Sequence, residues 1–148
     1  MNKLFILATA IIVLVVVAFK APKVNFDEDV TGGIQFKKES WNDVLKQAKK
    51  ENKLIFLDIY ATWCGPCKRL KSNTFSNEEV GKLYNQKFIN VALDGEKGEG
   101  LTLAQKYGVR SYPTLLFLDG NGNIVVRTGG YHNSDEFIEL GKTVAKSK

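Results

Sequence analysis

The chain has 148 residues, enough for one domain of ordinary size, and its apolar fraction of 44% and charged fraction of 25% are typical of a folded globular protein. Its net charge of +5 comes from 21 basic and 16 acidic residues. The basic residues are scattered along the chain and do not gather among aromatic residues. We therefore interpret the charge as a solvated surface and predict no nucleic-acid partner.

An apolar run opens the chain from Leu4 to Phe19, between Lys3 and Lys20. Its 16 residues would extend about 24 Å as a helix, between the length of a signal-peptide core and that of a membrane-spanning helix. A buried core helix is disfavoured because the run has no polar face. We predict that residues 1–20 are a cleaved signal peptide or an N-terminal membrane anchor, and favour the anchor because the candidate cleavage sites are poor.

Either role of this segment places the folded part outside the cytoplasm. Pro22 and the acidic residues that follow it predict a linker over residues 21–33, and residues 34–148 then form one folded domain. With residues 4–19 in a membrane, the linker would let this domain stand off the surface.

Hydrophobic periodicity predicts strands that alternate with helices through the domain. The predicted strands cover residues 34–37, 53–60, 88–93, 114–118 and 123–127. The predicted helices cover residues 41–52, the stretch that begins with the cysteine pair, the stretch after Ser76, residues 101–107, and residues 134 to about 145. Ser134 is the predicted cap of the last helix. Because the last two strands are joined by a DGNG turn, the pattern closes on a hairpin. It predicts an α/β fold with a mixed central sheet of four to five strands flanked by helices.

The chain has two cysteines, Cys64 and Cys67, and no others. A bridge across so short a loop constrains the unfolded chain very little, which argues against a purely structural disulfide. A zinc site would need two more ligands, and the single histidine, His132, lies far away in sequence. We therefore predict redox chemistry at the pair, without a metal ion.

The cysteine pair opens a helix directly after an apolar strand. Unpaired N–H groups and the helix macrodipole favour an anion at this place, which lowers the pKa of the Cys64 thiol. The thiolate is the species that attacks a disulfide. Pro66 fits the first helical turn because its missing N–H has no partner to lose there. Cys64 is thus the predicted nucleophile, and Cys67 the thiol that resolves the mixed disulfide.

Asp58 lies within the apolar strand, six residues before Cys64. Burial of an unpaired carboxyl there would raise its pKa, and such a group near the buried thiol can carry a proton to or from Cys67. The alternative is an aspartate near a strand end that backbone donors satisfy. The spacing alone does not decide between the two.

Three segments resemble the thioredoxin family: DIYATWCGPCK from Asp58 to Lys68, YGVRSYPT from Tyr107 to Thr114, and Gly129-Gly130. The similarity extends over about residues 36–146, most of the chain. The TFS sequence that follows the active-site helix, and the loop over residues 94–100, are more similar to the C-terminal domain of the bacterial transmembrane thiol–disulfide interchange protein than to cytosolic thioredoxin.

The resemblance implies a thioredoxin fold, the dithiol at Cys64 and Cys67, a proton-shuttling role for Asp58 and a cis peptide before Pro113. The substrate-contacting residues that it implies are Trp63, Gly65, Pro66, Tyr112, Pro113 and Gly129. The sequence departs from the family at one point. Thioredoxins place a lysine near the buried aspartate, and the candidate positions here hold Asn90 and Ala92.

The expected function is that of a membrane-tethered reductase, because Gly65-Pro66 is the thioredoxin dipeptide and implies a reducing dithiol. Its expected partners are disulfide-bearing client proteins and an upstream electron-donor thiol protein, and we expect a monomer that needs no cofactor. Two alternatives stay open at this point. One is an extracytoplasmic thiol oxidase or isomerase, and the other is a non-catalytic binding module on the same fold.

Overall fold

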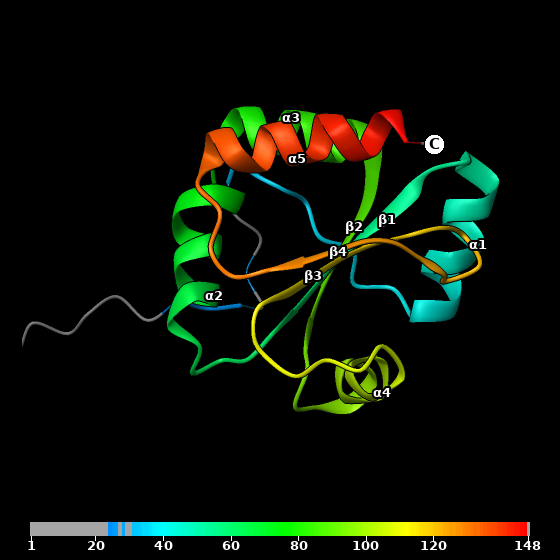
Figure 1. Cartoon of the computed structure of the whole chain (residues 1–148), viewed down its shortest axis with the longest axis horizontal. Coiled ribbons are helices and arrows are strands. Elements are labelled where there is room, and N and C mark those ends of the chain that lie inside the picture. The colour runs from blue at the N-terminus through cyan, green and yellow to red at the C-terminus, as the bar shows by residue number, and fades with distance from the viewer. Residues whose placement is uncertain (1–23, 27, 29–30, 148) are drawn as a thin grey trace, which may run out of the picture.

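A computed structural model describes residues 24–26, 28 and 31–147 (Figure 1). Its elements, in chain order, are α1 (Trp41–Glu51), β1 (Leu54–Tyr60), α2 (Gly65–Arg69), the π-helical stretch η1 (Leu70–Phe75), α3 (Glu78–Lys87), β2 (Phe88–Asp94), α4 (Gly98–Lys106), β3 (Thr114–Leu118), β4 (Ile124–Gly129) and α5 (Ser134–Lys146). The predicted signal or anchor segment, residues 1–20, lies outside the described residues. Among the helices that are described, none is long and apolar enough to cross a membrane.

The described strands form one sheet in the order β2-β1-β3-β4. Strand β1 runs parallel to β2 and antiparallel to β3, and β3 pairs antiparallel with β4. All seven residues of β1 are buried, as its continuous apolar sequence predicts for a central strand that is covered on both faces. The predicted α/β class, with a mixed central sheet flanked by helices, is confirmed.

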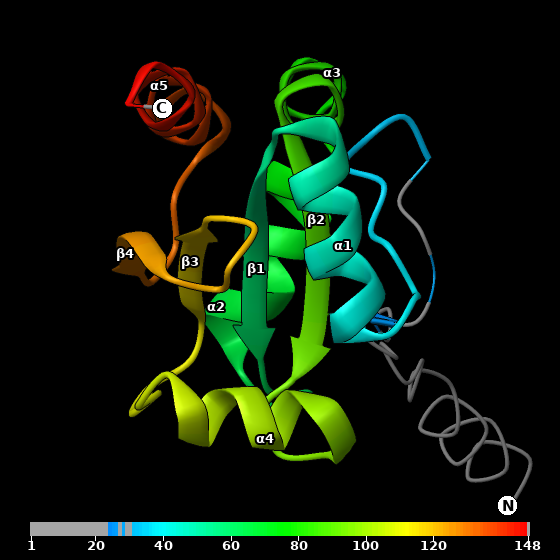
Figure 2. The same ribbon diagram turned by 90° about the vertical axis from the view of Figure 1, so that its right-hand side faces the viewer.

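Different helices cover the two faces of the sheet, because side chains alternate along each strand. Helices α1 and α4 pack on the face that carries Ile55, Leu57 and Ile59, where Trp41 of α1 is only 6% exposed. The stretch η1 and helices α3 and α5 cover the face that carries Phe56. Figure 2 shows α1 in front of β1 and β2, with α2 behind the sheet.

An aromatic cluster surrounds Phe56 on the second face. Its ring lies 5.2 to 5.9 Å from the ring centres of Phe75, Tyr84, Phe117 and Phe137. A buried Phe→Ala change typically costs about 3–5 kcal/mol of stability, so this cluster holds η1 and α5 firmly on the sheet. The cluster fixes the helical segment that carries the cysteines.

Residues 34–37, predicted as the first strand, are not a strand. The segment follows the edge of β2, where the N–H of Lys37 donates to the carbonyl of Asn90 at 2.8 Å. The N–H of Gln35, however, donates to the side chain of Asn85 on α3 at 2.9 Å. A side-chain acceptor thus takes the place of a strand partner, and no regular ladder forms.

Two helix starts also differ from the predictions. Helix α4 begins at Gly98 rather than at residue 101, and the carboxylate of Glu99 in its first turn accepts the N–H of Trp41 at 3.0 Å. Helix α5 is capped by Asn133 rather than by Ser134. The Asn133 side chain accepts the N–H of Glu136 at 3.0 Å, and the Glu136 carboxylate accepts the N–H of Asn133 at 3.0 Å. Long-range contact and a one-residue choice of cap lie outside what hydrophobic periodicity can predict.

Candidate active site

The two cysteines lie at the start of α2 and form a disulfide, with their Cα atoms 5.3 Å apart. Cys64 is the N-cap of the helix, and the backbone N–H of Cys67 donates to its Sγ atom at 3.2 Å. Pro66 occupies the first turn, as predicted. After reduction, the same N–H and the helix dipole are placed to stabilise a thiolate on Cys64. The geometry therefore suits Cys64 as the nucleophile and Cys67 as the resolving thiol.

An exposed aromatic rim borders the dithiol. The ring of Trp63 is 66% exposed and meets the ring of Tyr112 edge-on, with 6.0 Å between their centres. Tyr112 also packs against the small buried cluster that contains both cysteines. The indole N–H of Trp63 donates to the carboxylate of Glu96 at 3.1 Å. Sequence reasoning missed Glu96, because nothing in the spacing links this loop residue to Trp63.

Pro113 and Gly129 lie against each other at the ends of β3 and β4. The peptide bond between Tyr112 and Pro113 is cis, as the resemblance implies. A Cβ atom at position 129 would lie only 2.9 Å from the carbonyl oxygen of Pro113, so this close approach requires glycine. The N–H of Gly130 donates to the same oxygen at 3.3 Å. Gly65 and Pro66, the remaining predicted contact residues, are exposed beside Cys64.

Asp58 is buried in the middle of the sheet, only 3% exposed, between its register partners Ala92 on β2 and Leu115 on β3. Its Oδ1 atom accepts no hydrogen bond from the part of the chain that the structure describes. Burial raises the pKa of this carboxyl from 3.8 to about 7, and the charge of Lys71 opposes the rise. A carboxyl with this pKa exchanges protons near neutral pH, as a general acid or base must.

A cavity of about 430 Å³ reaches Asp58. Its lining comes from the N-terminal segment, the loop over residues 36–40, β1, β2, η1 and the first turn of α4. On the β2 side the register partner of Asp58 is Ala92, whose small side chain leaves the space open. Neither the cavity nor its charged lining is visible in the sequence, because distant segments form it.

Phe26 and Lys71 line this cavity and were not among the predicted site residues. The ring of Phe26 stacks on Tyr60, with 4.2 Å between the ring centres, so a residue of the predicted linker contacts the domain. The ammonium of Lys71 donates to the carbonyl of Glu28 at 2.6 Å. One sequence signal could have found Lys71: it follows Cys67 by four residues, which places both on one face of a helix.

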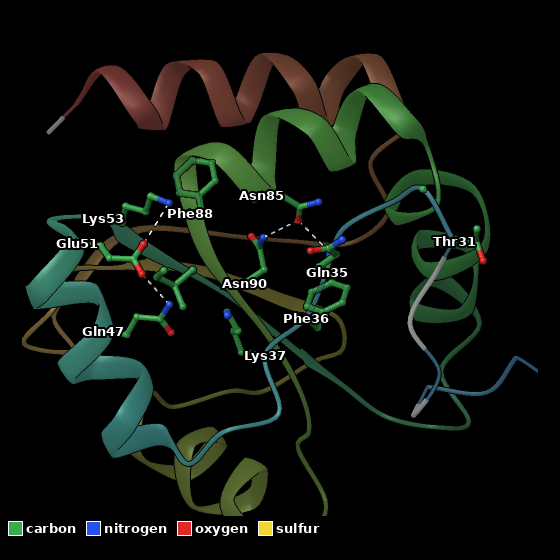
Figure 3. A pocket seen from close by; sticks show the side chains of 12 residues that line it. Thr31, Gln35, Phe36, Lys37, Gln47, Glu51, Lys53, Asn85, Phe88 and Asn90 are labelled. Atoms are coloured by element: carbon green, nitrogen blue, oxygen red, sulfur yellow. Dashed lines mark hydrogen bonds and ion pairs between the residues drawn. The ribbon is translucent and has the colours of Figure 1, made fainter.

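A second, larger cavity of about 660 Å³ lies among α1, α3 and the open edge of β2 (Figure 3). Asn85 joins its walls, because its Oδ1 accepts both the N–H of Gln35 at 2.9 Å and the side-chain amide of Asn90 at 3.2 Å. The cavity contains none of the predicted site residues. Within the described ranges, no group of three or more His, Cys, Asp or Glu side chains could hold a metal ion.

Comparison with known proteins places this geometry among redox proteins. A family model described as a thioredoxin-like domain matches residues 41–145. The thiol:disulfide interchange protein DsbD of Yersinia pestis is 33% identical over 105 residues, which cover 68% of this chain and 18% of that protein. The chain therefore spans less than a fifth of the length of this relative.

Two solved structures extend the comparison. The solution structure of a proposed disulphide isomerase from Bacteroides thetaiotaomicron has a TM-score of 0.67 and 43% identity, and covers 78% of this chain and 96% of that one. The C-terminal domain of DsbD from Neisseria meningitidis, in its reduced form, has a TM-score of 0.56 and 27% identity, and covers 68% of this chain and 90% of that one. The fold that the sequence resemblance implies is confirmed, as is the similarity to the DsbD C-terminal domain.

Proposed function

The chain belongs to the thioredoxin-like domain family and is a thiol–disulfide oxidoreductase, and from this premise we propose that its dithiol reduces disulfides of extracytoplasmic proteins. The observation that carries the proposal is the placement of Cys64 as the N-cap of α2, bonded to Cys67, beside the exposed ring of Trp63. The Gly65-Pro66 pair between the cysteines supports the reducing direction.

The proposed cycle begins with the reduced protein. The Cys64 thiolate attacks one sulfur of a client disulfide, forms a mixed disulfide and releases the other client sulfur as a thiolate. Asp58 then accepts the proton of Cys67, and the Cys67 thiolate attacks the Cys64 sulfur. The Cys64–Cys67 disulfide forms, and the second client sulfur leaves with the electron pair. An upstream dithiol protein supplies the two electrons that restore the reduced state.

The proposed client contacts lie around the nucleophile. Trp63 offers a large exposed apolar surface beside the dithiol, and Tyr112 supports its ring from one side. Gly65, Pro66, Pro113 and Gly129 present backbone or small side chains, which lets an extended client segment come close to Cys64. The working unit in this proposal is a monomer that binds one client disulfide at a time.

The proposed location is the extracytoplasmic face of a membrane. Support comes from the apolar run over residues 4–19 and from the DsbD relative, and the segment 21–33 would link the anchor to the domain over 34–148. Fractionation of cells that produce the full chain tests this location. We expect the protein in the membrane fraction and accessible to protease from outside; a mature protein that begins near Phe19 and is released in soluble form would instead identify a cleaved signal.

A trapping experiment tests the roles of the two cysteines. Cys67→Ser should accumulate a mixed disulfide with client proteins through Cys64, because the resolving thiol is gone. Cys64→Ser should accumulate none, because Cys67 lacks the N-cap position that stabilises a thiolate on Cys64. Equal trapping by both variants would contradict the assignment.

The reduction potential tests the direction of electron flow. Equilibration of the full chain with glutathione should place the potential of the Cys64–Cys67 couple nearer to about −270 mV, typical of thioredoxin, than to about −120 mV, typical of a strong oxidant. The second candidate function is an isomerase or oxidase, which the 43% identity to the proposed Bacteroides disulphide isomerase favours. A potential above about −180 mV would support that second function instead.

A further inference from the structure

Lys71 is held beside the cavity over Asp58 by two contacts. Its ammonium donates to the carbonyl of Glu28 at 2.6 Å and lies 5.6 Å from the centre of the Phe26 ring. The helical segment that carries it, α2 followed by η1, begins at the dithiol and is fixed to the sheet by Leu70 and Phe75. The position of the Lys71 charge is therefore set by the same segment that positions Cys67.

Several charged groups share this cavity with Asp58. They are Glu28 of the N-terminal segment, Lys37, Lys38 and Glu39 of the loop before α1, Lys71 of η1 and Glu99 of α4. The titratable neighbour on β1 is Tyr60, and β2 and β3 present the uncharged partners Ala92 and Leu115. Among the described groups, Lys71 is the one whose charge acts on the Asp58 carboxyl.

We propose that Lys71 is a positioning residue for proton transfer through Asp58, and that Phe26 and Glu28 hold it in that place. The inference deepens the proposed function, because Asp58 takes the Cys67 proton in each cycle. When the Cys67 S–H bond breaks, the proton passes to the Asp58 carboxylate and the sulfur lone pair forms the bond to Cys64. The bond between Cys64 and the client sulfur breaks, and that sulfur leaves as a thiolate. A cation beside Asp58 favours the ionised carboxylate that this step requires.

This role of Lys71 would compensate for the lysine that thioredoxins place near the buried aspartate and that this sequence lacks. Asn90 and Ala92 leave β2 without a lysine near the buried aspartate, and Ala92 is the register partner of Asp58. The active-site helix supplies the charge instead, four residues after Cys67. The same arrangement makes the charge sensitive to the N-terminal segment, because Phe26 and Glu28 contact the Lys71 ammonium.

Titration of Asp58 in the full chain tests the inference directly. Carboxyl carbon NMR of the oxidised protein, in which the pKa of Asp58 is about 7, should show this pKa rise in Lys71→Met. Lys71→Arg should keep the wild-type value, because it keeps the charge. Lys68→Met is the matched control. It removes one positive charge from α2, directly before η1, at a residue that does not line the cavity, and it should leave the pKa of Asp58 unchanged.

The kinetic consequence is a shifted pH profile. A higher pKa of Asp58 lowers its ionised fraction at pH 7, so the resolving step should slow there and recover at higher pH. A rise of one unit would correspond to a loss of about fivefold at pH 7. In an Asp58→Asn background, Lys71→Met should slow the step no further. An unchanged Asp58 titration in Lys71→Met, or an equal shift in Lys68→Met, would overturn the inference. The titration of Asp58 does not depend on the direction of electron flow. The inference about Lys71 can therefore fail while the reductase proposal stands, and the reverse.

Discussion

Two neighbouring cavities share Phe36 and Lys37 in their linings, and each contains a buried side-chain oxygen without a hydrogen-bond donor among the described residues. In the smaller cavity, of about 430 Å³, this atom is Oδ1 of Asp58. In the larger one, of about 660 Å³, it is Oδ1 of Asn90. The two residues differ in one respect that matters for chemistry: a carboxyl can gain and lose a proton, and an amide cannot.

The comparison shows that the size of a cavity does not identify the active site here. The larger cavity is lined by amides and by the partly exposed ion pair of Lys53 and Glu51, and none of the predicted redox residues lines it. The smaller cavity reaches a carboxyl whose strand leads directly to the dithiol. An unsatisfied oxygen is therefore informative when it is titratable and close to the reacting atoms, and is a modest local cost otherwise.

Asp58→Asn should give the largest effect, because it makes the smaller cavity chemically equivalent to the larger one. General-base catalysis typically contributes 100-fold or more, so the resolving step should slow by about 100-fold at pH 8. The dependence of the rate on pH around 7 should disappear with the carboxyl. Stopped-flow measurement of client reduction from pH 5 to 9 checks both results. A rate within twofold of wild type would remove Asp58 from the mechanism.

The same substitution should change how stability depends on pH. Because burial raises the pKa of Asp58 from 3.8 to about 7, the folded protein keeps a proton that the unfolded chain releases between these values. The free energy of unfolding should therefore fall as the pH rises through this window, by as much as about 4 kcal/mol in total. Asp58→Asn should lack this decline. Urea unfolding of the oxidised protein at pH 5 and pH 8 measures the difference, and parallel declines in the two proteins would contradict the burial argument.

Phe26→Ala should have an intermediate effect, because it opens the smaller cavity without removing the carboxyl. Loss of the ring that stacks on Tyr60 admits water to Asp58, and burial is what raises the pKa of this carboxyl. The pKa of Asp58 should fall below about 7, which a carboxyl titration measures. Phe26→Leu keeps an apolar cover and should stay close to wild type. A rise in the pKa of Asp58 in Phe26→Ala would contradict this expectation. It would mean that displacement of the Lys71 ammonium outweighs the hydration of the carboxyl.

Asn90→Val should give the smallest effect, and it tests the larger cavity. The change removes the hydrogen bond from Asn90 to Asn85 together with the unpartnered oxygen, so the free energy of unfolding should move by no more than about 1 kcal/mol. Neither the rate of client reduction nor its pH profile should change. A tenfold loss of activity would assign the larger cavity to the active site after all.

The part of the site that sequence could predict is the part that is contiguous or strongly patterned. Cys64, Cys67 and Asp58 lie within one strand–helix unit, and the apolar strand alone indicates that Asp58 is buried. Lys71 and Phe26 were missed because their roles depend on how separate segments pack, and no local pattern encodes the contact of Phe26 with Tyr60.

The fold shows the same distinction between features that have a local sequence signal and features that depend on packing. The central strand and the closing hairpin were predicted correctly, since each has a strong local signal in its apolar run or its turn residues. The segment over residues 34–37 was predicted wrongly because its alternation suits a strand, while a side chain on α3 takes one of its backbone donors. The π-helical stretch η1 was not predicted either, since its residues do not differ from those of an ordinary helix.

The two tryptophans of the chain give it a built-in optical readout of its redox state. Trp41 is 6% exposed on the face covered by α1 and α4, whereas Trp63 is 66% exposed and directly precedes Cys64. Disulfides quench the emission of nearby indoles, so reduction of the pair should brighten the red-shifted, solvent-exposed emission of Trp63 and leave the blue emission of Trp41 nearly constant. The ratio of the two bands would follow turnover in real time, without a label and without a coupled assay.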